Sequence, residues 1–97
     1  MKTTREILAL LEGAKPDLVR RFGVRRLALF GSYARGEQRE DSDVDVLVEV
    51  DPSIGLRFVD LADDIESLLG LRSEIVSHRA VKARNWKVIE KELIDVP

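Results

Sequence analysis

Two strand-like segments on either side of a short charged loop limit most strongly what this chain can fold into. The first, residues 27–30, is a continuous apolar run that stops at Gly31, which is typical of a strand buried on both faces. The second, Val44–Val50, alternates β-branched with acidic residues, which predicts a strand with one buried face. Helical patterns precede, separate and follow these strands. The sequence therefore predicts an α/β fold, a small mixed sheet of three or more strands flanked by helices.

Helical periodicity and capping signals account for much of the rest of the chain. Thr3 and Glu6 have the spacing of a capping box, which predicts a first helix that stops near Gly13. Pro16 suits the first turn of a second short helix, and Gly23 suits its end. The remaining elements expected are a brief helix over 32–35, helices over 58–69 and 81–93, and a third strand over 74–76.

Length and charge restrict the class of protein. The chain has 97 residues, 44% of them hydrophobic, which is enough to form one small hydrophobic core. Residues 1–97 are therefore expected to form a single domain. The 16 basic and 18 acidic residues give a net charge of −2, which argues against direct nucleic-acid binding. No apolar run approaches the roughly 18 residues that a membrane span needs. A cytoplasmic protein without a membrane partner is expected.

The scarcity of cysteine and histidine restricts the chemistry. The chain has no cysteine, which excludes disulfides, thiolate zinc sites and a cysteine nucleophile. It has one histidine, His78, which excludes a zinc centre made of several histidines. Any bound metal must therefore be held mainly by carboxylates, which favour hard cations such as Mg²⁺ or Mn²⁺.

Two acidic residues open the second strand-like segment. In a strand, Asp43 and Asp45 would point to the same face, about 6.5–7 Å apart along the chain, while Val44 and Val46 face the core. Two neighbouring carboxylates repel each other, and core packing does not explain them. They suit a site for divalent cations, where paired metals hold both ends of a phosphoryl displacement.

Gly31 and Ser32 lie where a buried strand meets a possible helix start. Glycine lets a phosphate approach the backbone closely, and free N–H groups at a helix start attract anions. The hydroxyl of Ser32 adds a donor. A phosphate-binding loop beside a carboxylate metal site is suited to bind a nucleoside triphosphate together with its Mg²⁺.

These two motifs together resemble the signature of a known superfamily. Gly31-Ser32, then ten residues, then Asp43-x-Asp45 is similar to the pattern of the DNA polymerase β-like nucleotidyltransferases. The run from Gly31 to Val50 and the chain length resemble the minimal nucleotidyltransferase branch, the small partners of HEPN-domain toxins in prokaryotic toxin–antitoxin pairs. The resemblance covers essentially the whole chain and implies a polymerase β-like nucleotidyltransferase core.

The resemblance also implies a role for each motif residue. Gly31 and Ser32 match the pair that holds the triphosphate, and Asp43 and Asp45 match the carboxylates that bind two catalytic Mg²⁺ ions. The family places a third acid, usually Asp, on a later strand, and Glu74 occupies that position here. Glu74 is one methylene longer than Asp; it could ligate a metal, help to deprotonate the acceptor hydroxyl, or misplace the charge.

The function implied by the resemblance is Mg²⁺-dependent transfer of a nucleotide, AMP from ATP or another nucleoside triphosphate, to a hydroxyl, commonly of tyrosine. The acceptor would be a cognate HEPN toxin, with this chain as the antitoxin of a type VII toxin–antitoxin system and the pair forming a hetero-oligomer. An alternative is a non-catalytic antitoxin that neutralises its partner by binding. Transfer to a small molecule is disfavoured, because relatives of that kind carry an added helical domain for the acceptor.

Several residues around the motifs have two possible roles. Arg35 and Arg39 could contact phosphate or balance the acidic charges of the loop. Asp41 and Ser42 are expected to cap or turn the chain into the strand, with a metal role as the alternative. Tyr33 and Trp86 are expected mainly to pack, in the core or at an interface.

Overall fold

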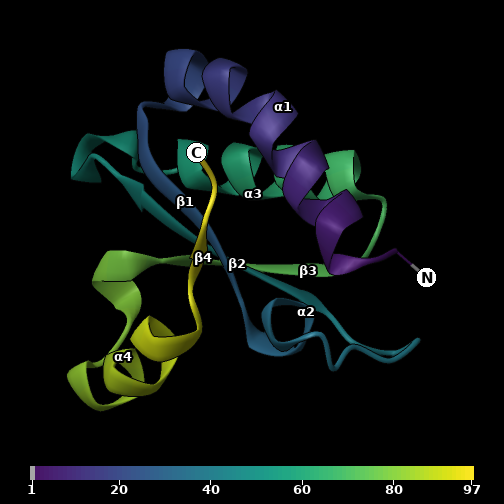
Figure 1. Cartoon of the computed structure of the whole chain (residues 1–97). Coiled ribbons are helices and arrows are strands. Elements are labelled where there is room, and N and C mark those ends of the chain that lie inside the picture. Colours follow the sequence, from purple (N-terminus) through teal and green to yellow (C-terminus); the bar gives the residue numbers. More distant parts are fainter. Residues whose placement is uncertain (1) are drawn as a thin grey trace.

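The computed structural model describes residues 2–97, which are organised around a four-stranded mixed sheet (Figure 1). The elements are α1 (Thr4–Phe22), β1 (Val24–Phe30), α2 (Gly31–Arg35), β2 (Val44–Val50), α3 (Arg57–Leu69), β3 (Ser73–Ser77), α4 (Ala83–Ile89) and β4 (Ile94–Asp95), with 3₁₀ turns at Pro52–Ile54, His78–Ala80 and Glu90–Glu92. The strand order is β3-β2-β1-β4. β1 is antiparallel to β2 and β4, whereas β2 and β3 are parallel. The predicted α/β fold is confirmed.

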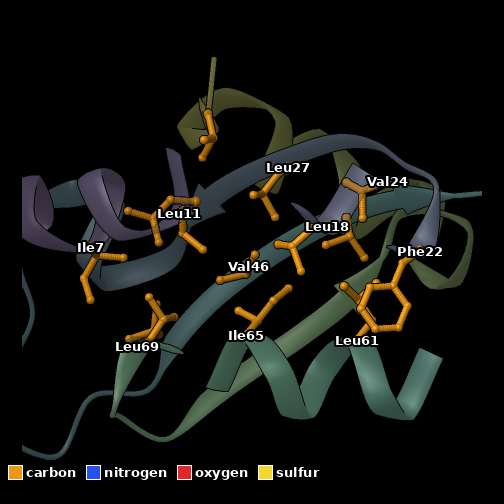
Figure 2. Packing of buried hydrophobic residues seen from close by; sticks show 14 of the residues in the cluster. Ile7, Leu11, Leu18, Phe22, Val24, Leu27, Val46, Leu61, Ile65 and Leu69 are labelled. Atoms are coloured by element: carbon orange, nitrogen blue, oxygen red, sulfur yellow. The ribbon is translucent and has the colours of Figure 1, made fainter. Parts of the chain in front are cut away.

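The two faces of the sheet are covered differently. Helices α1 and α3 cover one face, and α4 lies on the other (Figure 1). Val44, Val46 and Val48 of β2 are fully buried, as the alternating pattern predicted. Figure 2 shows apolar side chains of α1 and α3 gathered over the face that carries Val46. These helices contribute the buried side chains of Ile7, Leu11, Leu18, Phe22, Leu61, Ile65 and Leu69. The acidic residues that alternate with the valines along β2 therefore lie on the α4 face.

The prediction of two separate N-terminal helices was wrong. One helix, α1, runs through both Gly13 and Pro16. Glycine inside a helix costs about 1 kcal/mol and proline about 3 kcal/mol relative to alanine. The apolar face shared by both halves of α1 buries enough surface against the sheet to outweigh these local costs. The capping box of Thr3 and Glu6 and the helix end at Gly23 are confirmed.

The C-terminal part differs from the predicted single helix over 81–93. Helix α4 is shorter, and the chain then returns to the sheet as β4, which the sequence did not predict. β4 pairs with Ala28 and Leu29 of β1, and the N–H of Val96 donates to the carbonyl of Leu27 at 2.8 Å. Lys15 of α1 donates to the carbonyl of Val96 at 2.9 Å. These contacts fix the C-terminal segment beside the end of β1.

Of the helices formed by residues 2–97, none combines the length and the apolar character that crossing a membrane requires.

Candidate active site

Three strands bring the predicted site residues together at one end of the sheet. In the antiparallel β1–β2 pair Phe30 lies opposite Asp45, and in the parallel β2–β3 pair Asp45 lies opposite Glu74. Directly paired residues share a face, so Phe30, Asp45 and Glu74 form one row on the α4 face. Gly31 follows Phe30 immediately. The register thus places Asp45 between two other predicted site residues, Gly31 and Glu74.

The backbone of Gly31 lies directly against Asp45. Gly31 is buried and has a φ of 74°, a left-handed conformation that other residues adopt only with strain. A Cβ placed on Gly31 would lie 2.1 Å from Oδ2 of Asp45. Only glycine therefore lets the carboxylate of Asp45 sit against the start of α2.

The electrostatic surroundings of Asp45 are unfavourable for a bare carboxylate. Burial, followed by the negative charge of Glu74, a side-chain hydrogen bond with Glu74, and the charges of Asp43 and Glu92, raises the pKa of Asp45 to about 6. The charged neighbours that raise it are all acids. Such a cluster of oxygen donors suits a hard divalent cation, which would relieve the repulsion.

Asp43 is held in an ion pair with Arg72. It precedes β2 by one residue, and its Oδ1 accepts a hydrogen bond from Nε of Arg72 at 2.6 Å. Across the part of the chain that the structure describes, no three acidic or histidine side chains are grouped so that they could hold a metal ion as they stand. The oxygen donors of Asp43, Asp45 and Glu74 fit Mg²⁺ chemically, and Arg72 would compete with the cation for Asp43.

Glu92 is the site residue that the sequence interpretation missed. Its Oε1 accepts a hydrogen bond from the N–H of Gly31 at 3.0 Å, and its Oε2 accepts one from Nη1 of Arg35 at 2.8 Å. Arg35 also pairs with Glu37 at 2.7 Å. Two of the donors predicted to bind phosphate, Gly31 and Arg35, therefore converge on a single anion, the carboxylate of Glu92. Nothing in the sequence around Glu92 indicates this contact, because it depends on the return of the chain to β4.

The structure places the remaining candidate residues outside the acidic row, each in a different surrounding. Tyr33 is buried and packs in the core, as expected. Ser42 accepts a hydrogen bond from the N–H of Arg39 at 2.9 Å, which confirms that it turns the chain before β2. Trp86 stacks on His78, with ring centroids 4.1 Å apart, and His78 lies 3.4 Å from Glu49. Glu49 is at the other end of β2 from the acidic row, so this pair is separate from the site.

The crowded carboxylates predict an effect on stability. Asp45→Asn is expected to stabilise the metal-free protein at neutral pH. The pKa of Asp45 in the folded protein, about 6, exceeds its ordinary value of 3.8, so the folded wild-type protein is stabilised when this carboxyl takes up a proton. This stabilisation is fully present below about pH 3.8 and is lost as the pH rises through about 6. The variant carries no such charge at any pH.

Thermal unfolding in EDTA checks this expectation. The melting temperature of Asp45→Asn should nearly equal that of the wild type near about pH 4 and exceed it by roughly a few degrees near about pH 7.5. Asp41→Asn, in the exposed loop before β2, serves as the control and should show no such trend. A difference for Asp45→Asn that stays constant over this pH range would contradict the expectation.

Known proteins resemble this chain in family, sequence and fold. The family described as "Nucleotidyltransferase domain" matches residues 11–96. The Thermococcus cleftensis protein named protein adenylyltransferase MntA is 44% identical over 98 residues, which cover 99% of this chain and 98% of the relative. A solved structure assigned as a minimal nucleotidyltransferase has a TM-score of 0.74 at 38% identity, covering 96% of this chain and 95% of that one.

A more distant structure shares the fold. It is that of a tri-AMPylated Shewanella oneidensis HEPN toxin in complex with MNT antitoxin, in which the similar chain has a TM-score of 0.65 at 20% identity. The similarity covers 93% of this chain and 71% of that chain. The same sheet and helices therefore occur in a chain of that complex.

Proposed function

This chain belongs to the nucleotidyltransferase domain family, and on that premise we propose that it transfers AMP from ATP to a hydroxyl group of a partner protein, using Mg²⁺. The observation that carries the proposal is the row of Asp45 and Glu74 beside the backbone of Gly31. At this end of the sheet, carboxylates that suit a cation lie beside a backbone N–H group that suits an anion.

The triphosphate would bind at the start of α2. The N–H of Gly31, the hydroxyl of Ser32 and the guanidinium of Arg35 are its donors. Their arrangement is supported by Glu92, a carboxylate that both Gly31 and Arg35 already bind. Guanidinium and backbone N–H groups bind phosphate with the same geometry that they use for carboxylates.

The carboxylates would bind the metal and accept the proton of the acceptor hydroxyl. Asp43, Asp45 and Glu74 would bind Mg²⁺, two ions by the family pattern, with Mn²⁺ as a substitute. Bound Mg²⁺ supplies positive charge that offsets the charge of the phosphates in the transition state. The acceptor oxygen bonds to the α-phosphorus, the bond from that phosphorus to the bridging oxygen of the leaving group breaks, and pyrophosphate departs. Glu74, exposed at the outer strand of the row, serves as ligand or takes up the hydroxyl proton.

The acceptor would be a tyrosine of a cognate HEPN toxin. A relative that is 44% identical is named a protein adenylyltransferase, which supports a protein as the acceptor. A chain of the same fold was solved in a complex that contains an AMPylated HEPN toxin. We therefore assign this chain the role of antitoxin in a type VII toxin–antitoxin system. It would act in the cytoplasm, where ATP is present, in a hetero-oligomer with the toxin that it silences by AMPylation.

A second candidate function is neutralisation by binding alone. It is favoured by Glu74, which stands where the family pattern usually has Asp, and by the ion pair that holds Asp43 against Arg72. Co-expression of toxin and antitoxin in cells separates the two functions. Catalysis predicts that Asp43→Ala loses protection, and wild-type protection by Asp43→Ala would favour binding.

Removal of Glu92 is expected to tighten nucleotide binding. In the free protein its carboxylate holds two of the three donors assigned to the triphosphate, Gly31 and Arg35, so a triphosphate must displace it. Glu92→Ala should lower the dissociation constant of Mg²⁺ and a non-hydrolysable ATP analogue by about five-fold or more, measured by titration calorimetry. Glu90→Ala, on the same 3₁₀ turn, is the matched control. Unchanged or weaker binding by Glu92→Ala would instead mean that Glu92 supports the loop.

A further inference from the structure

The segment from Lys82 to Lys91, which contains α4, carries an unbalanced positive charge. Its one acidic residue is Glu90, although the whole chain has a net charge of −2. Its basic residues are all exposed; they are Lys82, Arg84, Lys87 and Lys91. Six arginines elsewhere in residues 2–97 are held in ion pairs with carboxylates, whereas none of these basic side chains is. The positive charge of this segment is therefore not neutralised by contacts within the chain.

Helix α4 is also covered less than the other α-helices. Helices α1, α2 and α3 each contain buried residues, and α4 contains none. Arg84, Lys87 and Val88 have the three- and four-residue spacing of one helix face, and Lys91 follows in the next 3₁₀ turn. Val88 is 65% exposed. These four residues, here called the α4 surface, combine an exposed apolar side chain with three cations.

The α4 surface adjoins the candidate active site. Lys82 and Arg84 line the same hollow as Phe30 and Glu74, which belong to the row of Asp45. Helix α4 lies on the face of the sheet that carries this row (Figure 1). A protein large enough to cover the row must also cover neighbouring surface on that face, and α4 is the helix that it meets there.

We propose that the α4 surface docks an acidic surface of the acceptor protein. The proposal rests on the proposed function and names the chemistry by which its second substrate is recognised. Carboxylates of the acceptor pair with the guanidinium of Arg84 and the ammonium groups of Lys87 and Lys91, and an apolar side chain of the acceptor covers Val88. Such complementary charges speed association and fix the orientation in which the acceptor approaches the acidic row.

A nucleic acid is the competing occupant of a basic surface. Single-stranded nucleic acids bind such surfaces through phosphates and through bases that stack on aromatic rings. Trp86, the aromatic residue of α4, is already stacked on His78, with ring centroids 4.1 Å apart. The apolar residue among the cations is instead Val88, and the net negative charge of the chain repels phosphates. An acidic protein surface therefore fits α4 better than a nucleic acid does.

Charge reversal on α4 tests the docking surface without altering the residues assigned to catalysis or to the nucleotide. Lys87→Glu/Lys91→Glu is expected to raise the dissociation constant of the complex with the cognate toxin at least about ten-fold, measured by biolayer interferometry without ATP. Its Mg²⁺-ATP binding should stay at the wild-type level. Lys87→Arg/Lys91→Arg keeps the charge and should bind the toxin as the wild type does.

A matched control separates docking from net charge. Arg5→Glu/Arg20→Glu changes the net charge by the same amount, at two exposed positions of α1 on the other side of the sheet. It should bind the toxin within about two-fold of the wild type, because salt screens charges that lie more than about 10 Å from a contact. Added salt should weaken toxin binding by the wild type more than binding by Lys87→Glu/Lys91→Glu.

Four results would overturn the docking proposal. The first is toxin binding by Lys87→Glu/Lys91→Glu equal to that of the wild type, and the second is an equal loss in Arg5→Glu/Arg20→Glu. The third is weaker Mg²⁺-ATP binding by Lys87→Glu/Lys91→Glu, which would assign these residues to the nucleotide. The fourth is a shift of the Val88 methyl resonances in NMR on addition of oligouridylate, which would make α4 a nucleic-acid surface.

The proposed function fails in a different way. Wild-type protein that binds the toxin through Lys87 and Lys91 but transfers no AMP to it would refute the proposed function and leave the docking surface intact.

Discussion

Asp45→Asn is expected to reduce AMP transfer at least about 10³-fold, the largest loss expected from any single change in this protein. Asp45 lies at the centre of the site, between Gly31 at the start of α2 and Glu74 of the neighbouring strand. The amide keeps the shape of the side chain but removes the charge that would bind Mg²⁺. Transfer is measured with ATP radiolabelled at the α-phosphate and the partner protein as acceptor.

Stability provides the internal control for this variant. Because metal-free Asp45→Asn is also expected to melt higher than the metal-free wild type at neutral pH, a higher melting temperature in EDTA shows that its loss of activity is not due to unfolding. Asp41→Asn, in the adjacent loop, should transfer AMP within about two-fold of the wild-type rate, since surface changes of this kind have small effects. Activity of Asp45→Asn within ten-fold of the wild type would contradict the role assigned to Asp45.

Gly31→Ala is expected to be the most destabilising change at the site. The alanine would need a φ near 74°, which costs about 1–2 kcal/mol, and its Cβ would collide with Oδ2 of Asp45 at 2.1 Å. Relief of the collision by displacing Asp45 adds about 1–3 kcal/mol and separates the carboxylate from the loop. Chemical denaturation should therefore give a total loss of about 2–5 kcal/mol in the free energy of unfolding, accompanied by loss of AMP transfer.

Gly36 provides a matched control for this prediction. Its φ is 70°, almost that of Gly31, but a Cβ on Gly36 would have no atom within 4 Å. Gly36→Ala should therefore cost only the conformational part, about 1–2 kcal/mol. The double variant Gly31→Ala/Asp45→Ala should recover most of the difference, because the collision partner is gone. Equal costs for Gly31→Ala and Gly36→Ala would show that the contact with Asp45 is not tight.

The strands and helices that pack against the core could be predicted because their periodicity reports burial. β2 is an example, since its alternating valines are all buried in the structure. Helix α1 shows where local signals mislead: Gly13 and Pro16 predict a break, but burial of one continuous apolar face keeps the helix intact. β4 has two residues, too few to produce a periodic pattern, and it forms because β1 offers a free edge.

The site was predictable only in part. Gly31 and the acids carry a spacing that resembles a known family, and the parallel register of β2 and β3 places Glu74 beside Asp45. The ion pair between Asp43 and Arg72 and the contact of Glu92 with Gly31 could not be foreseen. Both join residues far apart in the sequence through side chains whose neighbours only the folded chain determines.

Catalysis by this chain is tested most directly by the mass of the partner toxin after incubation with the chain, ATP and Mg²⁺. The toxin is expected to gain the mass of one or more whole AMP groups on tyrosine with the wild-type protein and to gain none with Asp45→Asn. A toxin that keeps its unmodified mass yet is neutralised equally by both proteins would contradict catalysis and establish neutralisation by binding.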